Sequence, residues 1–342
     1  MAEWLPRAGL VGLCLLGAAT TASAEAVSDF YRGKTLSLIA GFPPGGGYDT
    51  YVRIVARHFG RFVPGEPAVV PSNMPGAGSL TAANHIYRNA APDGLALAMF
   101  ASSAAMEPLL GNKAALFDPT KFSWVGSMSN DVAYCGLWQG PGVPTTFDEM
   151  LTKETIFGGG AAAAVTFQHP MVLKNVLGAR IRVISGYAGS RDIVLAMQRG
   201  EVNGVCALPV SSIKAQFPKD VEEGRLKLVI QMGPKRTDEF GHVPSAFDYV
   251  KTENDRKVLE FYFNQNLLGR PLAGPPGMPK ERLAILRKAF ADTMRDAAFL
   301  ADARRADLDI DPATGEQAEE LLIRFGDYPK SVIENAKAAI RR

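Results

Sequence analysis

The stretch Gly41-Phe42-Pro43-Pro44-Gly45-Gly46-Gly47-Tyr48-Asp49 decides the fold class, because the periodicity of the chain changes across it. Before it, residues 36–40 form a short apolar run that is typical of a buried strand. After it, apolar residues recur at helical spacing, at Val52, Val55 and Phe59. The stretch therefore predicts a glycine-rich loop that joins a strand to a helix.

The same unit recurs further along the chain. Residues 68–70 predict a second strand, which the loop Asn73-Met74-Pro75-Gly76-Ala77-Gly78 joins to a second helical pattern. A third strand at residues 95–100 ends at Ala101-Ser102-Ser103. Further short strands are predicted at residues 181–184, 205–208 and 226–230. Strands that alternate with helices predict a mainly parallel α/β sheet, in which ligands bind beyond the carboxyl ends of the strands.

The first 24 residues have the layout of a secretory signal peptide. Arg7 precedes an apolar run at residues 8–19, and Ala22-Ser23-Ala24 provides a small-residue cleavage site. Cys14 does not indicate a lipoprotein, because Leu13 before it is not small and the apolar run continues past it. We therefore expect cleavage after Ala24 and a periplasmic protein.

Length and charge narrow the class of protein. The chain has 342 residues, which predicts about two domains once the signal peptide is removed. We place domain 1 at residues 25–130 with 262–342, and domain 2 at residues 131–261. The formal net charge is only +2, which argues against a nucleic-acid-binding protein.

The two glycine-rich loops favour an anionic ligand. Glycine lets the backbone approach a ligand closely, and the first turn of the following helix presents unpaired amide donors. Neither loop has the spacing of a dinucleotide-binding or P-loop motif, so a carboxylate is favoured over a nucleotide. Asp49 is expected to cap the helix through backbone donors rather than to touch an anion. The alternative, that each loop is only a tight turn, stays open for either loop alone.

Six motifs together resemble those of the Bug family, the extracytoplasmic receptors of tripartite tricarboxylate transporters. They are the two glycine-rich loops, Ala91-Pro92-Asp93-Gly94, Gly186-Tyr187-Ala188-Gly189-Ser190, Gly200-Glu201-Val202-Asn203-Gly204 and Pro275-Pro276-Gly277-Met278-Pro279. The resemblance implies a type II periplasmic-binding-protein fold, with two α/β domains that close on the ligand. It also implies integral-membrane permease subunits as partners and a monomeric receptor without cofactor or metal.

The resemblance also implies a set of ligand-binding residues, which hold one carboxylate largely through backbone amides and bridging water. The set comprises Phe42, Pro43, Pro44, Gly45, Gly46, Gly47, Tyr48, Asp49, Asn73, Pro75, Gly76, Ala77, Gly78, Ser102, Ser103, Ala161, Thr166, Tyr187, Gly189 and Ser190.

Several positions leave alternatives open. Arg191 follows Ser190 where a small residue is more usual in the family; it could pair with a second carboxylate, but a solvent-facing arginine in a first helical turn is the favoured interpretation. Cys135 and Cys206 could form a disulfide or remain two buried thiols. His169 is expected to be structural.

Three functions are compatible with these features, and reversible capture of a carboxylate for a permease is the leading one. A periplasmic hydrolase is disfavoured, because the sequence has no G-x-S-x-G elbow and no zinc-ligand spacing. Ser102 or Ser103 could act as a nucleophile only beside a histidine. A receptor that feeds a sensor kinase is not separated from a transport receptor, and the identity of the carboxylate is left undecided.

Overall fold

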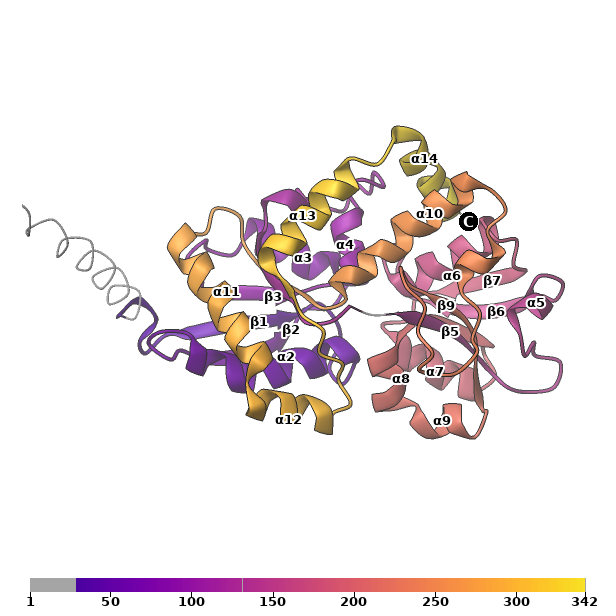
Figure 1. Ribbon diagram of the computed structural model, residues 1–342, viewed down its shortest axis with the longest axis horizontal. Coiled ribbons are helices and arrows are strands. Elements are labelled where there is room, and N and C mark those ends of the chain that lie inside the picture. Colours follow the sequence, from indigo (N-terminus) through magenta and orange to yellow (C-terminus); the bar gives the residue numbers. More distant parts are fainter. Residues whose placement is uncertain (1–28, 131, 342) are drawn as a thin grey trace, which may run out of the picture.

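The computed structural model describes residues 29–130 and 132–341, so the predicted signal peptide lies outside the described residues. The described chain folds into two lobes, each built on a β-sheet with helices on its faces (Figure 1). This arrangement confirms the predicted α/β class with two domains. None of the helices in these residues has the length and hydrophobicity of a membrane-spanning segment.

The first lobe contains a six-stranded sheet in the order β11-β4-β10-β3-β1-β2. Its strands are β1 (Thr35–Ala40), β2 (Ala68–Asn73), β3 (Ala96–Met99), β4 (Ser123–Ser127), β10 (Pro271–Gly274) and β11 (Ala313–Thr314). Neighbouring residues of β1 point to opposite faces, and both faces are apolar: Leu38 packs in one core and Ile39 in the other. Helices cover both faces of the sheet, which is why the strand reads as a continuous apolar run.

Helices of the first lobe come from both ends of the chain. They are α2 (Gly47–His58), α3 (Leu80–Arg88), α4 (Ser102–Met106), α11 (Lys280–Arg295), α12 (Ala297–Arg305) and α13 (Gly315–Gly326). Helix α2 packs on β1 and β2, α3 on β3, and α11 and α13 on β4. The C-terminal helices thus complete a lobe that the N-terminal strands begin.

The second lobe contains a five-stranded sheet in the order β7-β6-β8-β5-β9. Its strands are β5 (Ala133–Trp138), β6 (Thr155–Gly159), β7 (Ile181–Ser185), β8 (Gly204–Pro209) and β9 (Leu226–Met232). Its helices are α5 (Phe147–Met150), α6 (Val165–Asn175), α7 (Ser190–Gln198), α8 (Val210–Gln216) and α9 (Pro218–Glu222). Cys135 of β5 and Cys206 of β8 form a disulfide, which settles the alternative left open by the sequence.

Both sheets are mixed, so the expectation of mainly parallel sheets is only partly right. Parallel pairs join β1 to β2 and β3, and β6 to β7 and β8. Antiparallel pairs join β10 to β3 and β4, β11 to β4, and β5 to β8 and β9. Strand β4 leads out of the first lobe and β10 returns to it, so these two neighbours run in opposite directions.

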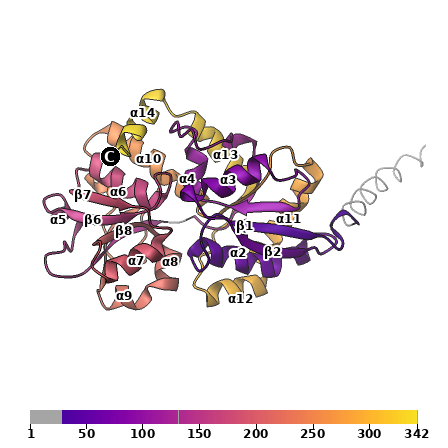
Figure 2. The same cartoon turned by 180° about the vertical axis from the view of Figure 1, so that it is seen from behind.

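The chain crosses between the lobes more than once. It leaves the first sheet after β4 and returns through α10 (Glu253–Phe263), which lies across the two lobes in Figure 1. The last helix, α14 (Lys330–Ala339), then packs against α10 and α6. Figure 2 shows α14 and the C-terminus beside the second lobe from behind as well. We propose the domain limits at residues 130/131 and 261/262 as the sequence places them.

Candidate ligand-binding cleft

Three strand ends of the first lobe lie at one edge of its sheet. Strand β1 pairs in parallel with β2 and β3, and the last residue of β1, Ala40, is level with Asn73 and Met99. Gly41 donates its amide to the carbonyl oxygen of Met99 at 2.9 Å, and Met74 donates to that of Ala40 at 2.8 Å. The loops that follow β1, β2 and β3 therefore begin side by side, as parallel pairing requires.

The first two loops are held together by the carboxylate of Asp49. Its Oδ2 accepts hydrogen bonds from the amide of Gly45 and from Nε of Arg53, both at 2.8 Å. Its Oδ1 accepts from Nδ2 of Asn73 at 2.8 Å, and the same nitrogen donates to the carbonyl oxygen of Phe42 at 2.9 Å. Asp49 thus braces the start of α2 through a backbone donor, as the sequence predicts, and also binds the second loop.

These three hydrogen bonds keep the carboxyl group of Asp49 ionised. Burial by itself would raise the pKa of its carboxyl, but the hydrogen bonds from Arg53, Gly45 and Asn73 outweigh burial and hold the pKa below its ordinary value. Asp49 is therefore ionised at neutral pH, and both of its oxygens accept hydrogen bonds from protein donors. The N-cap residue Gly46 supplies no side-chain hydrogen bond to the start of α2.

Replacing Asp49 with alanine is expected to lower the free energy of unfolding by about 1–2 kcal/mol, because three charge-assisted hydrogen bonds are lost. Urea unfolding at pH 7 measures this change. Asp29→Ala is the matched control: Asp29 pairs with Arg32, and the two side chains are 62% and 69% exposed. That pair should contribute less than about 0.5 kcal/mol. Equal losses in the two variants would show that the Asp49 bonds add no stability.

The second loop has an unusual backbone. Gly76, Ala77, Gly78 and Ser79 have φ angles of +138°, +48°, +67° and +73°. Left-handed conformations cost about 1–2 kcal/mol for residues other than glycine, so the surrounding contacts must hold Ala77 and Ser79 in place. The Ser79 hydroxyl provides one such contact, because it accepts a hydrogen bond from the amide of Ala101 at 2.8 Å. The loop after β2 is thereby tied to the loop after β3.

Two loops of the second lobe are joined in the same way. Gly160, just beyond β6, donates its amide to the hydroxyl oxygen of Thr166 at 3.0 Å. The carbonyl oxygen of Gly159 accepts from the amides of Gly186 and Tyr187, at 3.0 and 3.2 Å. Residues 159–166 and 186–190 therefore form one unit at the carboxyl ends of the parallel strands β6 and β7.

The two lobes meet at these loops. A Cβ atom placed on Gly78 would lie 2.7 Å from the backbone nitrogen of Ala164 and 2.8 Å from the carbonyl carbon of Ala163. Ser103 donates its hydroxyl to the carbonyl oxygen of Ala163 at 3.1 Å. Deeper in the interface, Gln168 of α6 donates to the buried carboxyl of Glu107. The lobes are therefore in contact along the predicted cleft.

Aromatic side chains line the base of the first loop. The rings of Phe42 and Tyr48 stack with their centroids 4.4 Å apart, and Tyr48 donates its hydroxyl to the carbonyl oxygen of Gly269 at 3.2 Å. The guanidinium of Arg270 lies over the rings of Tyr48 and Tyr51, 4.5 and 4.9 Å from their centroids. These contacts link the first loop to the segment that returns from the second lobe.

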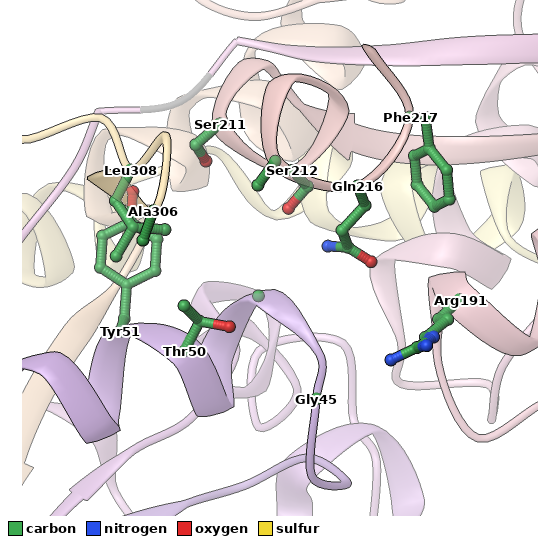
Figure 3. A pocket seen from close by; sticks show the side chains of 12 residues that line it. Gly45, Thr50, Tyr51, Arg191, Ser211, Ser212, Gln216, Phe217, Ala306 and Leu308 are labelled. Atoms are coloured by element: carbon green, nitrogen blue, oxygen red, sulfur yellow. The ribbon is translucent and has the colours of Figure 1, made fainter. Parts of the chain in front are cut away.

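A cavity of about 400 Å³ opens beside the first loop, between α2 and α8 (Figure 3). Three polar residues of α8 that no sequence motif indicates also line it: Ser211, Ser212 and Gln216. The predicted strand at residues 205–208 could have identified them, because α8 follows this strand directly and ligands bind beyond strand ends. Arg191 also lines this cavity, and it is exposed in the first turn of α7.

The described residues contain no group of His, Cys, Asp or Glu side chains arranged to hold a metal ion. In the described part of the chain, neither Ser102 nor Ser103 hydrogen-bonds a histidine, and the Ser103 hydroxyl is already bonded to Ala163. Neither of these two serines therefore has the histidine partner that would activate it.

Comparison with known proteins gives the same fold. No protein-family model matches the chain. A sequence relative, the UPF0065 protein in gbd 5'region of Cupriavidus necator, is 24% identical over 255 residues, which cover 71% of this chain and 72% of the relative.

Solved structures extend the likeness to almost the whole chain. The periplasmic binding protein BugD superposes with a TM-score of 0.71 at 17% identity, over 90% of this chain and 98% of its own. MatC of Rhodopseudomonas palustris with bound malate gives a TM-score of 0.65 at 18% identity, over 88% and 99%. An R. palustris protein with adipate, Rpa4515, gives 0.67 at 16% identity, over 88% and 97%. The first of these neighbours is a periplasmic binding protein, and the other two hold a small carboxylate. By its loop motifs, its sequence relative and its fold, the chain resembles the Bug family of periplasmic solute-binding proteins, as its sequence indicates.

Proposed function

We propose that the chain is a periplasmic solute-binding protein that captures a small carboxylate between its lobes and delivers it to a membrane permease. The observation that carries this proposal is the meeting of glycine-rich strand ends from both lobes, where Gly78 lies against Ala163 and Ala164. Such a contact suits a cleft that closes over a ligand and excludes water. The malate and adipate bound to two structural neighbours support a carboxylate as the ligand.

The ligand carboxylate would lie between the loop after β1 and the loop after β2. The amides at the start of α2 supply donors and the positive end of the helix dipole, while Asp49 and Asn73 keep the two loops in register. The residues predicted in the second lobe, from Ala161 to Ser190, would complete the enclosure. The loops hold no nucleophile–base pair, and reversible capture needs none.

Thermal unfolding in the presence of organic acids tests the proposal. A carboxylate at 100 times its dissociation constant stabilises the folded state by about 2.7 kcal/mol, which raises Tm by about 4 °C for a chain of this size. Glucose and magnesium chloride serve as controls and should leave Tm unchanged. A shift with glucose or magnesium and none with any mono-, di- or tricarboxylate would refute the proposal.

A further inference from the structure

A buried carboxyl group joins the two lobes one helical turn beyond Ser103. Glu107 follows α4, whose first residues, Ser102 and Ser103, are predicted to bind the ligand. Its Oε1 accepts a hydrogen bond from Nε2 of Gln168 in the first turn of α6, a turn that also holds Thr166. Glu107 and Gln168 are 3% and 1% exposed. The bond therefore connects a predicted ligand-binding segment of each lobe at a point that solvent does not reach.

The donors to this carboxyl are neutral. Its Oε2 accepts a hydrogen bond from Nδ2 of Asn112, so both printed donors, from Asn112 and Gln168, are amides. Among the described residues, no lysine, arginine or histidine forms an ion pair with Glu107. An uncompensated charge is costly in a buried site, and burial accordingly raises the pKa of Glu107 against the lowering effect of the two amides. The carboxyl thus takes up a proton more readily than a glutamate in water.

The groups packed around Glu107 do not titrate in the same range. Burial, and then the nearby charge of Glu107, raise the pKa of Tyr262 of α10, so this phenol stays protonated. His169, next to Gln168, is kept neutral by burial, which lowers its pKa to about 3. The turn Asn264–Leu268, which packs on α4, contains only amide and leucine side chains. A change of charge at this cluster under mildly acidic conditions therefore comes from Glu107.

We propose that Glu107 is a positioning residue of the cleft, which holds α4 against α6 when the lobes are in contact, and that uptake of a proton by its carboxyl favours this contact. The inference rests on the proposed function and adds a regulation to it: capture of the carboxylate becomes tighter as the pH falls toward mildly acidic values.

The direction of the effect follows from what surrounds the carboxyl in each state. When the lobes separate, water replaces the amide of Gln168, and a glutamate in water has a pKa of about 4.5. When they are in contact, the pKa of Glu107 lies above that value. The state that binds the proton more tightly gains population as the pH falls, so protonation favours contact and ionisation favours separation. Closure therefore takes up as much as one proton from solvent.

Small-angle scattering of the ligand-free protein tests this link directly. The radius of gyration of wild type should decrease as the pH falls from 8 to 5. Glu107→Gln is neutral at every pH and still offers an oxygen to Gln168, so it should keep the smaller radius throughout. Gln168→Leu removes the donor from the second lobe and should give a larger radius than wild type at pH 8. Equal radii for wild type and Glu107→Gln at every pH overturn the proposal.

Glu154→Gln is the matched control, because it removes a carboxylate that is 63% exposed on the second lobe. Its radius of gyration should follow that of wild type at every pH. If Glu154→Gln instead behaves as Glu107→Gln does, the response belongs to the overall charge of the protein, and the proposal fails.

Calorimetric titration with malate and adipate separates this inference from the proposed function. The ratio of the affinities of wild type and Glu107→Gln for one acid should fall at least about threefold between pH 5 and pH 8. The ligand's own titration cancels in this ratio, because both proteins bind the same acid. A constant ratio overturns the role of Glu107 and leaves the proposed function standing. If wild type binds no carboxylate, the proposed function fails, and the scattering of the ligand-free protein still decides the role of Glu107.

Discussion

Replacing Gly78 with alanine is expected to lower carboxylate affinity by up to about 100-fold. The added methyl group would lie 2.7 Å from the Ala164 nitrogen, well inside van der Waals contact. This nitrogen and the carbonyl carbon of Ala163, at 2.8 Å, are backbone atoms, which cannot change rotamer to relieve the clash. Overpacking of this kind costs about 1–3 kcal/mol, and here the cost falls on the closed arrangement of the lobes. Calorimetric titration with adipate measures the loss, and small-angle scattering shows whether the lobes still approach each other.

A control must separate the clash from backbone strain, because Gly78 also has a φ of +67°. Gly277 has a φ of +78°, and no atom lies within 4 Å of a Cβ placed on it. Gly277→Ala therefore introduces the same backbone strain but no steric clash. It should lose stability by about 1–2 kcal/mol and keep its affinity. If Gly78→Ala binds adipate as Gly277→Ala does, the contact between Gly78 and the second lobe is unimportant for binding.

Acidification from pH 7 to pH 4 is expected to cost the protein about 3 kcal/mol of folding free energy through His169 alone. Burial lowers the pKa of this imidazole to about 3, from 6.5. Between these values the unfolded chain binds a proton that the folded chain does not, so stability falls as the pH falls. Each pH unit below 6.5 costs about 1.4 kcal/mol, and the loss levels off near pH 3.

His169→Leu should remove this dependence. His169 packs edge-on against Phe263, and neither ring nitrogen has a partner among the described residues, so leucine loses no hydrogen bond there. The variant should be more stable than wild type at pH 4 by about 3 kcal/mol in urea unfolding. His242→Leu, at an exposed site, is the control and should follow wild type at every pH. Parallel curves for wild type and His169→Leu would mean that His169 becomes protonated within the folded protein.

The buried carboxyl of Glu107 acts in the opposite direction and does not disturb this comparison. Burial raises its pKa, against the lowering effect of the hydrogen bonds from Asn112 and Gln168. A raised carboxyl pKa makes the folded state lose stability as the pH rises above about 4.5. The residue is present in wild type and in both histidine variants, so its contribution cancels in the differences.

Sequence patterns predicted the structure best where a single element or contact depends on residues that are close together in the chain. The apolar run at residues 36–40 became β1, and the helical spacing after Asp49 became α2. Asp49 braces a backbone amide, as an acidic residue at a helix start is expected to do. Its bond to Asn73 could not be predicted, because it depends on β1 and β2 being neighbours.

The mixed sheets and the position of Arg191 beside the first loop could not be predicted for the same reason. Nothing local to residues 271–274 indicates that they pair between β3 and β4, since β4 lies more than 140 residues earlier in the chain. Arg191 has the local features of an exposed arginine in a first helical turn, and it is one. Its closeness to Gly45 arises only when the lobes meet.

Sequence patterns alone indicate the fold class, the glycine-rich loops at the strand ends and the resemblance to carboxylate receptors, because strand, loop and helix signals act within about ten residues. Tertiary packing decides which of these loops touch, that Cys135 and Cys206 are bonded, and that Arg191 lines a cavity beside Gly45. Those facts depend on contacts between distant segments, and such contacts are formed by packing two lobes around one cleft.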